Sequence, residues 1–407
     1  MTGMNAITKS FTGRKRIRKS FGRLPEVAPL PAPRTALRGP GWVRDEHRSP
    51  GERRVRITAV AGGVGGARFL RGLKDHLAAS PDPERRAAQV TAVVNTGDDA
   101  TMHGLRITPD LDTVMYTLGG AVHEEQGWGL RDESRVVSSE LAAYGTGPDW
   151  FTLGDRDLGT HVFRTQMLRE GLPLSRVVER LCERWQPGVR LLPMSDQPVE
   201  THVHLADGRT VHFQEWWVRL RASVPATGFA QVGLEAASPA PGVLEALADA
   251  DAVLLPPSNP VVSLGTVLGL APGPDGTVHP GAPRGLPGAR EALRDGGAPV
   301  VGVSPVLGGR VVRGMADACL AALGVPSTAL GVGGLHADLL DAWLVDDAAD
   351  GDLDGTALPG AAPGRGRVLA RPLLMSDREA AAALAGAALD TALAIGRTDR
   401  RSPGSPS

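Results

Sequence analysis

The stretch AVAGGVGGARFLRGL, residues 59–73, places four glycines within five residues and then continues as an apolar helical pattern. It follows VRIT, and together VRITAVA predicts a buried strand. Phe69, Leu73 and Leu77 fall on one face of the helix that follows. A strand that ends in glycines and opens a helix can hold phosphate, because bare backbone N–H groups approach the anion closely and the helix N-terminus favours it. Tight packing of the helix against the strand is the alternative explanation.

The glycine loop departs from two standard phosphate-binding motifs. A P-loop needs Gly-Lys-Ser/Thr, but Ala67 and Arg68 follow Gly66. The dinucleotide fingerprint needs a third glycine where Arg68 stands, and the first acid after the next predicted strand, Asp98, comes too late to bind the ribose. A nicotinamide oxidoreductase is therefore the less favoured alternative. We expect the phosphates of another ligand to bind at the loop residues Gly62, Gly63, Val64, Gly65 and Gly66.

The remaining chain predicts an α/β fold. QVTAVVN is a second strand, and a strand–helix–strand unit predicts a parallel sheet. ADAVLLPP and APVVGVSP repeat the pattern of an apolar run that ends in a polar loop. We therefore predict a Rossmann-like three-layer parallel sheet over residues 55–395, with a mainly helical insertion at about 126–188. SDRE, residues 376–379, predicts a capping box before the last helix, and a disordered tail is expected over 396–407.

Residues 1–54 are basic and then rich in proline, which predicts a disordered arm. Contact of this arm with nucleic acid or an anionic surface is the alternative. The net charge of −1 argues against nucleic-acid binding by the chain as a whole. No apolar run has the length of a membrane span, and the two cysteines cannot form a disulfide framework. We therefore expect a cytoplasmic protein with no membrane or nucleic-acid partner.

Acidic residues follow the second predicted strand. Asp98 and Asp99 come directly after it, and Asp110 and Asp112 open a later helix. Because ligands of open parallel sheets bind beyond the carboxyl ends of the strands, these carboxylates are expected to face the glycine loop. Carboxylates beside phosphate indicate Mg²⁺. Helix capping is the alternative for Asp110, and a turn role is the alternative for Asp98 or Asp99.

Three further motifs carry candidate site residues. In LGDRDLGTHVFR, Arg156 lies between two aspartates, as either a guanidinium fork for a diphosphate or a surface ion pair. His161 in the same motif is open between a structural and a catalytic role. Ser258 and Asn259 in PPSNPVVS offer hydrogen bonds to a base or ribose. The adjacent tryptophans of VHFQEWWVR suggest either a flat aromatic ligand or core packing.

Taken together, the motifs closely resemble the 2-phospho-L-lactate transferase family, in the form of its bacterial phosphoenolpyruvate transferase branch. The likeness runs from about residue 55 to about residue 393. It is carried by AVAGGVGGARFLRGL, VVNTGDDATMHG, TPDLDTVMYTLGG, LGDRDLGTHVFRTQMLREG, LLPMSDQPVETHV, HFQEWWVR, LLPPSNPVVSLG and GVSPVLGGRVVRGMADACL. The long amino-terminal arm departs from the family pattern.

The resemblance implies a step in the biosynthesis of the deazaflavin coenzyme F-420. The expected donor is a guanosine diphosphate ester of enolpyruvate or lactate, and the sequence leaves the choice of acid open. The phospho-acid passes to the ribityl hydroxyl of the deazaflavin Fo, GMP leaves, Mg²⁺ is required, and a homodimer is expected. A UDP-sugar-binding regulatory protein of the gluconeogenesis-factor type is the alternative, because such distant relatives share the glycine loop.

The resemblance also assigns roles to residues. Asp98 and Asp112, with Asp99 as a further candidate, are expected to bind the metal. Asp112 could instead orient the attacking hydroxyl. Arg156 is expected to stabilise charge on the transferred phosphoryl group or to hold the acceptor. The guanosine half is expected at Ser258 and Asn259, and the flat ring near residues 194–196 and Trp217.

Overall fold

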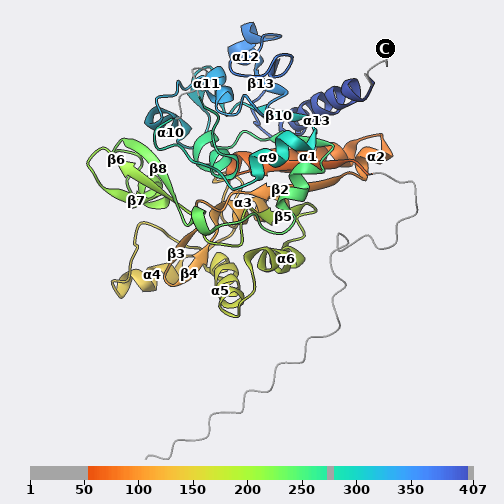
Figure 1. Cartoon of the computed structure of the whole chain (residues 1–407). Helices are drawn as coiled ribbons and strands as arrows, with labels where there is room; N and C mark the ends of the chain where they lie inside the picture. Colours follow the sequence, from red (N-terminus) through yellow and green to blue (C-terminus); the bar gives the residue numbers. More distant parts are fainter. Residues whose placement is uncertain (1–53, 273–278, 402–407) are drawn as a thin grey trace, which may run out of the picture. The chain divides into compact units, whose positions relative to one another are not determined.

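The computed structural model describes residues 54–272 and 279–401 of the chain (Figure 1). All of them belong to one unit, Arg44–Ser407, and the other unit, Met1–Val43, lies outside the described residues. The predicted arm falls outside them almost entirely.

A parallel sheet of seven strands forms the centre of the fold (Figure 1). Its strands are nearly continuous apolar runs, as expected for strands that are covered on both faces. The sheet confirms the predicted α/β class and the four predicted strands. In spatial order the strands are β14 (Arg367–Arg371), β13 (Ala342–Asp346), β10 (Val300–Val303), β9 (Ala252–Leu255), β1 (Arg56–Ala61), β2 (Gln89–Val94) and β5 (Arg190–Pro193).

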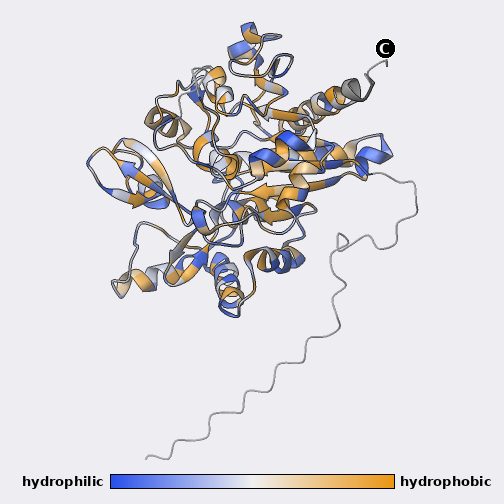
Figure 2. Ribbon diagram, in the orientation of Figure 1, coloured by the Kyte–Doolittle hydropathy of each residue, from blue (hydrophilic) through white to orange (hydrophobic). Residues whose placement is uncertain are grey.

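The two faces of this sheet belong to two separate hydrophobic cores. Ile57 and Ala59 of β1 pack into one core, and Val60, between Ala59 and Ala61, packs into the other. This alternation is the two-residue period of a strand. Apolar colour accordingly runs along the central strands in Figure 2. The first core is completed by helices α1 (Val64–Ala79), α3 (Pro109–Leu118), α6 (Leu174–Trp185) and α13 (Arg378–Arg401).

The second core is completed by five short helices and a small antiparallel sheet, which gives three layers in all. The helices are α7 (Val243–Ala248), α8 (Gly265–Leu268), α9 (Ala289–Gly296), α10 (Ala316–Ala322) and α11 (Ala329–Gly334). The small sheet has the order β7 (Thr210–His212), β6 (Glu200–Leu205) and β8 (Ala226–Val232). It was not predicted from the sequence, and it contains part of the VHFQEWWVR motif.

The other elements connect these layers. They are α2 (Pro83–Arg86), α4 (Val136–Ala143), α5 (Asp155–Arg169) and α12 (Asp347–Asp350), the hairpins β3 (Ala100–Met102) with β4 (Leu105–Ile107) and β11 (Val306–Leu307) with β12 (Arg310–Val311), and the turns η1 (Glu215–Arg219), η2 (Leu234–Ala236), η3 (Pro260–Leu264) and η4 (Gly351–Leu353). Helices α4, α5 and α6 fall within the region predicted to be helical. The division into arm, domain and insertion stays a prediction.

Helix α13 differs from its prediction at both ends. It begins at Arg378, and Asp377 Oδ1 accepts a hydrogen bond from the backbone N–H of Ala380 at 2.8 Å, whereas the Ser376 hydroxyl bonds to Asp377. The predicted capping box is therefore wrong, because Asp377 takes the capping role. The helix also continues to Arg401, past the predicted start of the tail.

Among the described residues, α13 is the one helix long and apolar enough to span a membrane. Its buried residues, such as Leu384 and Leu389, pack into the first core beside α1.

The order of the strands predicts a ligand site at β1 and β9. These strands are neighbours, but β1 leads into α1 in the first core and β9 leads through η3 into α8 in the second. The chain thus leaves two adjacent strands towards opposite faces of the sheet. Open α/β sheets bind their ligands at such a point, beyond the carboxyl ends of the strands.

Candidate active site

The glycine loop joins the end of β1 to the start of α1. A Cβ at Gly62 would lie 2.4 Å from Ser263 Cβ, and one at Gly65 would lie 2.1 Å from the carbonyl oxygen of Pro257. The Gly62 amide donates to Ser258 Oγ at 3.1 Å. The loop after β9 therefore packs directly on the glycine backbone. Tight packing, the alternative explanation for the glycines, accounts for these two positions.

The other side of the loop meets an acid. A Cβ at Gly63 would lie 2.9 Å from Asp110 Oδ1. Asn95 Nδ2 donates to Asp110 Oδ2 at 2.9 Å, and Asn95 Oδ1 accepts from the Gly97 amide. The Asp110 carboxylate therefore faces the glycine loop as expected, and the alternative role as a helix cap is not needed for it. Residues 63–65 are only half-buried, so this part of the loop stays accessible to a ligand.

Four carboxylates gather beside this loop, all with side chains that are almost fully buried: Asp98, Asp99, Asp110 and Asp112. Burial raises the pKa of Asp98 and of Asp99 well above the usual range, and the charge of Asp110 raises both further. Burial also raises the pKa of Asp112, and it raises that of Asp110 to about 6. Burial and mutual repulsion disfavour the charged forms of these carboxylates, and a bound cation would favour them.

Several oxygens of this acidic cluster have no donor. Within the part of the chain that the structure describes, Asp98 Oδ1, both Asp99 carboxylate oxygens and Asp112 Oδ2 are buried without a hydrogen-bond partner. Buried polar atoms are rarely left unpaired unless an ion or water completes them. Carboxylate oxygens are the ligands that Mg²⁺ takes in proteins. The residues present therefore fit the predicted magnesium site.

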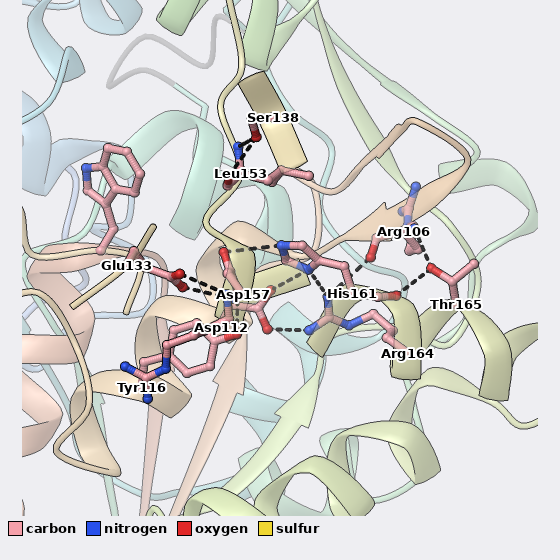
Figure 3. Close-up of polar contacts among 12 residues, drawn as sticks. Arg106, Asp112, Tyr116, Glu133, Ser138, Leu153, Asp157, His161, Arg164 and Thr165 are labelled. Carbon is pink, nitrogen blue, oxygen red and sulfur yellow. Dashed lines mark hydrogen bonds and ion pairs between the residues drawn. The ribbon is translucent and has the colours of Figure 1, made fainter. Parts of the chain in front are cut away.

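Two guanidinium groups reach this cluster (Figure 3). Arg164 is 1% exposed, and its Nη2 pairs with Asp112 Oδ1. Arg106 Nη2 lies 3.5 Å from Asp99 Oδ2, while its Nη1 is 2.5 Å from Glu200 Oε1. Two arginines face four clustered carboxylates, and Arg106 is shared with Glu200. The described residues therefore bring fewer positive than negative charges to the cluster.

Helix α5 supplies a polar network behind Asp112 (Figure 3). Arg164 Nη1 lies 3.1 Å from His161 Nδ1, and His161 Nε2 lies 3.2 Å from Asp157 Oδ2. Since a guanidinium can only donate, Nδ1 accepts and the ring proton sits on Nε2, towards Asp157. Tyr116 then donates its hydroxyl to Asp157 Oδ1 at 2.6 Å. Ligand atoms of Asp112, Asp157 and His161 lie within 4.8 Å of one another, but Arg164 already supplies a positive charge there.

The structure brings only some of the predicted residues together. The glycine loop, Asp98, Asp99, Asp112 and Ser258 meet at one edge of the sheet. Arg156 is exposed, and its guanidinium donates to the carbonyl of Arg131 at 2.7 Å, so it does not contact the acidic cluster here. Asn259 accepts from the amides of residues 261 and 262 and so caps η3. Their predicted roles stay predictions.

Sequence reasoning missed Asn95, Arg106 and Arg164. A signal for Arg164 was present, because Asp157, His161 and Arg164 have the spacing of one helical face. No comparable signal marks Arg106, which reaches the cluster only through the β3–β4 hairpin.

A pocket of about 470 Å³ opens beside the cluster. Its walls come from the loop after β2, from the β3–β4 hairpin, from the end of α5 with the start of α6, and from the loop after β5. The lining includes Thr96, Asp99, Arg106, Arg169, Leu172 and Asp196. Asp196 belongs to the stretch expected near the flat ring. Trp217 instead stacks on Phe213 with ring centroids 6.4 Å apart, and it is not part of this lining.

Comparisons with known proteins agree with the motifs. The chain matches the family model of "2-phospho-L-lactate transferase CofD" over residues 57–357. It is 54% identical over 345 residues to the phosphoenolpyruvate transferase of Thermobifida fusca, which covers 84% of this chain and 99% of that protein. It is 51% identical over 351 residues to the phosphoenolpyruvate transferase of Mycolicibacterium smegmatis, which covers 83% of this chain and 99% of that protein.

Among solved structures, a UPF0052-family protein from Bacillus halodurans matches with a TM-score of 0.49 and 16% identity, over 83% of this chain and 100% of that chain. A likeness at this level says nothing about function. The family match spans most of the described chain, and the relatives match along nearly their whole length. The resemblance predicted from the motifs is thereby confirmed: the chain belongs to the 2-phospho-L-lactate transferase family and is an enzyme of the transferase class.

Proposed function

We propose that this enzyme moves the phospho-acid of a guanosine diphosphate ester to the ribityl hydroxyl of the deazaflavin Fo and releases GMP, in coenzyme F-420 biosynthesis. The names of the relatives favour enolpyruvate over lactate as the acid. The observation that carries the proposal is the buried cluster of carboxylates with unpaired oxygens beside the glycine loop.

The proposed step is a phosphoryl-type transfer between a diphosphate and an alcohol. A bond forms between the acceptor oxygen and the phosphorus that carries the acid, and the bond from that phosphorus to the bridging oxygen breaks. GMP leaves with the electron pair, and the hydroxyl proton passes to a carboxylate of the cluster. Catalysis of such a step depends on positioning and on neutralising charge.

The acidic cluster would hold Mg²⁺ through Asp98, Asp99 and Asp112. When bound, the ion neutralises charge on the oxygens of the diphosphate. Arg164 keeps one oxygen of Asp112 occupied, and the other, Oδ2, accepts no hydrogen bond from the described residues and lies 3.7 Å from His161 Nδ1. Asp112 could alternatively orient the attacking hydroxyl.

The amides of the half-buried residues 64 and 65 would bind the diphosphate, because the N-terminus of α1 favours an anion, whereas the backbone of Gly63 is hydrogen-bonded to the Asp110 carboxylate. The guanosine half would lie towards the loop of Ser258 and Asn259, whose side chains fix the loop's shape. The acceptor would enter the pocket beside Asp99, because this residue belongs to both the pocket wall and the acidic cluster.

The test combines purified protein, Fo, Mg²⁺ and each guanosine ester, and follows GMP by chromatography. We expect GMP and the phosphorylated deazaflavin in equal amounts, and none of either when EDTA replaces Mg²⁺. Tight binding of a UDP-sugar without any release of GMP would instead support the regulatory alternative.

The proposal includes the role expected of Arg156 in stabilising the transferred phosphoryl group or holding the acceptor. Arg156→Lys should slow turnover, because an ammonium cannot replace a bidentate guanidinium; an unchanged rate would leave Arg156 a surface residue.

We also propose that the enzyme acts in the cytoplasm as a homodimer. Light scattering measures the mass of the assembly and so tests the homodimer.

A further inference from the structure

Two arginines, Arg68 and Arg313, stand together beside the glycine loop. Arg68 is on α1, two residues after Gly66, at the position where a dinucleotide fingerprint has its third glycine. Arg313 follows the β11–β12 hairpin. Among the described residues, neither guanidinium forms an ion pair with a carboxylate, whereas Arg71, one turn further along α1, pairs with Glu124 at 2.7 Å.

The positions of the two guanidinium groups are fixed by adjacent carbonyls. Arg68 Nη2 donates to the carbonyl of Glu124 at 3.3 Å, and Arg313 Nη2 donates to the carbonyl of Glu125 at 2.9 Å. Burial lowers the pKa of Arg68, and the neighbouring charge of Arg313 lowers it further. Two like charges are thus held side by side, Arg68 partly buried and Arg313 exposed, with the charge of Glu124 offsetting part of their repulsion at Arg68. Such a pair favours a bound anion.

The pair also lies next to the first turn of α1. A Cβ at Gly127 would be 2.7 Å from Arg313 Nη1 and 2.8 Å from Val64 Cγ1. Arg313 and Val64, a residue of the glycine loop, therefore both lie against Gly127. Side chains of a helix lean towards its N-terminus, which directs Arg68 towards the same end. The pair therefore borders the place where the diphosphate is proposed to bind.

We propose that Arg68 and Arg313 bind the carboxylate of the donor's three-carbon acid. This inference rests on the proposed function. The donor carries a diphosphate and one further anionic group, the carboxylate. In the proposed function, the diphosphate is bound by the loop amides and by the ion that the acidic cluster would hold. The two arginines are therefore available to bind the carboxylate. A guanidinium is suited to it, because its planar fork matches the two carboxylate oxygens.

The test compares two ligands on the full-length protein by titration calorimetry in Mg²⁺, without acceptor. One ligand is the guanosine diphosphate ester of the acid, and the other is GDP, which lacks the carboxylate. For Arg68→Met and Arg313→Met we expect the ester to bind roughly 10- to 100-fold more weakly, with little change for GDP. Arg85→Met, which removes an exposed ion pair with Asp390 on another part of the chain, is the control and should bind both ligands as the wild type does.

Two results would overturn the proposal. Equal weakening for the ester and for GDP would assign the arginines to a phosphate instead, and unchanged binding of both ligands would leave the pair without a role in the donor site. Circular dichroism verifies that each variant is folded, and Arg313 is exposed, so its substitution leaves the core intact. Failure of the proposed function is distinguishable, because then the wild-type protein itself would release no GMP.

Discussion

At the residue scale, the site depends on carboxylates that the fold holds against their own repulsion. Asp99 is the clearest case, because it is 1% exposed and neither of its oxygens accepts a hydrogen bond from the described residues. A group kept in so unfavourable a place is typical of a functional site, where stability is given up for binding.

Asp99→Asn should therefore separate stability from function. We expect its melting temperature in EDTA to rise by a few degrees, because one buried charge is removed from a cluster of like charges. Mg²⁺ should no longer stabilise the variant, and turnover should fall at least about 100-fold. Differential scanning calorimetry with and without Mg²⁺ measures the first two effects. A variant that Mg²⁺ stabilises as strongly as the wild type would exclude Asp99 from the metal site.

Arg164 should act as one half of a pair with Asp112. Arg164→Met leaves a buried carboxylate without its counter-charge, and the free energy of unfolding should fall by about 3–5 kcal/mol. Adding Asp112→Asn should recover much of that loss, although not the activity, because neighbouring substitutions are not additive. Urea denaturation of both single variants and the double variant measures this coupling, and simple additivity would contradict it.

At the element scale, the connection from β1 to α1 needs glycine for a steric reason. Gly65→Ala would place a methyl group 2.1 Å from the Pro257 carbonyl, which is backbone and cannot turn away. We expect a loss of stability of about 2 kcal/mol or more, together with weaker GDP binding. Gly159→Ala is the matched control, because it lies on the exposed side of α5 with nothing within 4 Å of the added carbon. It should be neutral or slightly stabilising.

The segment after α11 gives a prediction on pH. His336 is buried against the Pro260 carbonyl at the start of η3, and burial lowers its pKa from 6.5 to about 3. Between pH 6.5 and about pH 3, the His336 ring is therefore protonated in the unfolded chain and neutral in the folded chain. The stability that depends on the neutral ring is full above pH 6.5 and is lost as the pH falls towards 3.

His336→Gln should reduce this acid sensitivity. The difference in unfolding free energy between pH 7 and pH 4 should be smaller in the variant than in the wild type, since a glutamine does not take up the proton. Urea denaturation at both pH values gives the comparison. An unchanged pH dependence would show that other groups dominate it.

Elements with a strong local pattern could be predicted from the sequence, and those set by tertiary contact could not. VRITAVA and QVTAVVN are apolar runs long enough to predict buried strands, and the structure contains both as β1 and β2. The three-stranded sheet β7–β6–β8 was missed although β6 alternates buried and more exposed residues, because one of its buried positions is a threonine and β8 lacks a regular alternation. Capping stayed an alternative for Asp110 because only the fold places its carboxylate against Gly63.

At the scale of the whole molecule, the order of the strands explains why distant motifs form one site. The loops after β1, β2 and β9 are far apart in sequence, but their strands are neighbours in the sheet, and all three run in the same direction. Their carboxyl ends therefore open onto one crevice.

The central claim is that the acidic cluster beside the glycine loop holds the divalent ion that binds the diphosphate. Its most direct test is anomalous diffraction from crystals of the protein grown with Mn²⁺ and GDP. The account predicts one strong anomalous peak, about 2.0–2.3 Å from oxygens of at least two of Asp98, Asp99 and Asp112 and in contact with the diphosphate. A peak on Asp157 and His161 instead, or a diphosphate bound with no ion at the cluster, would contradict it.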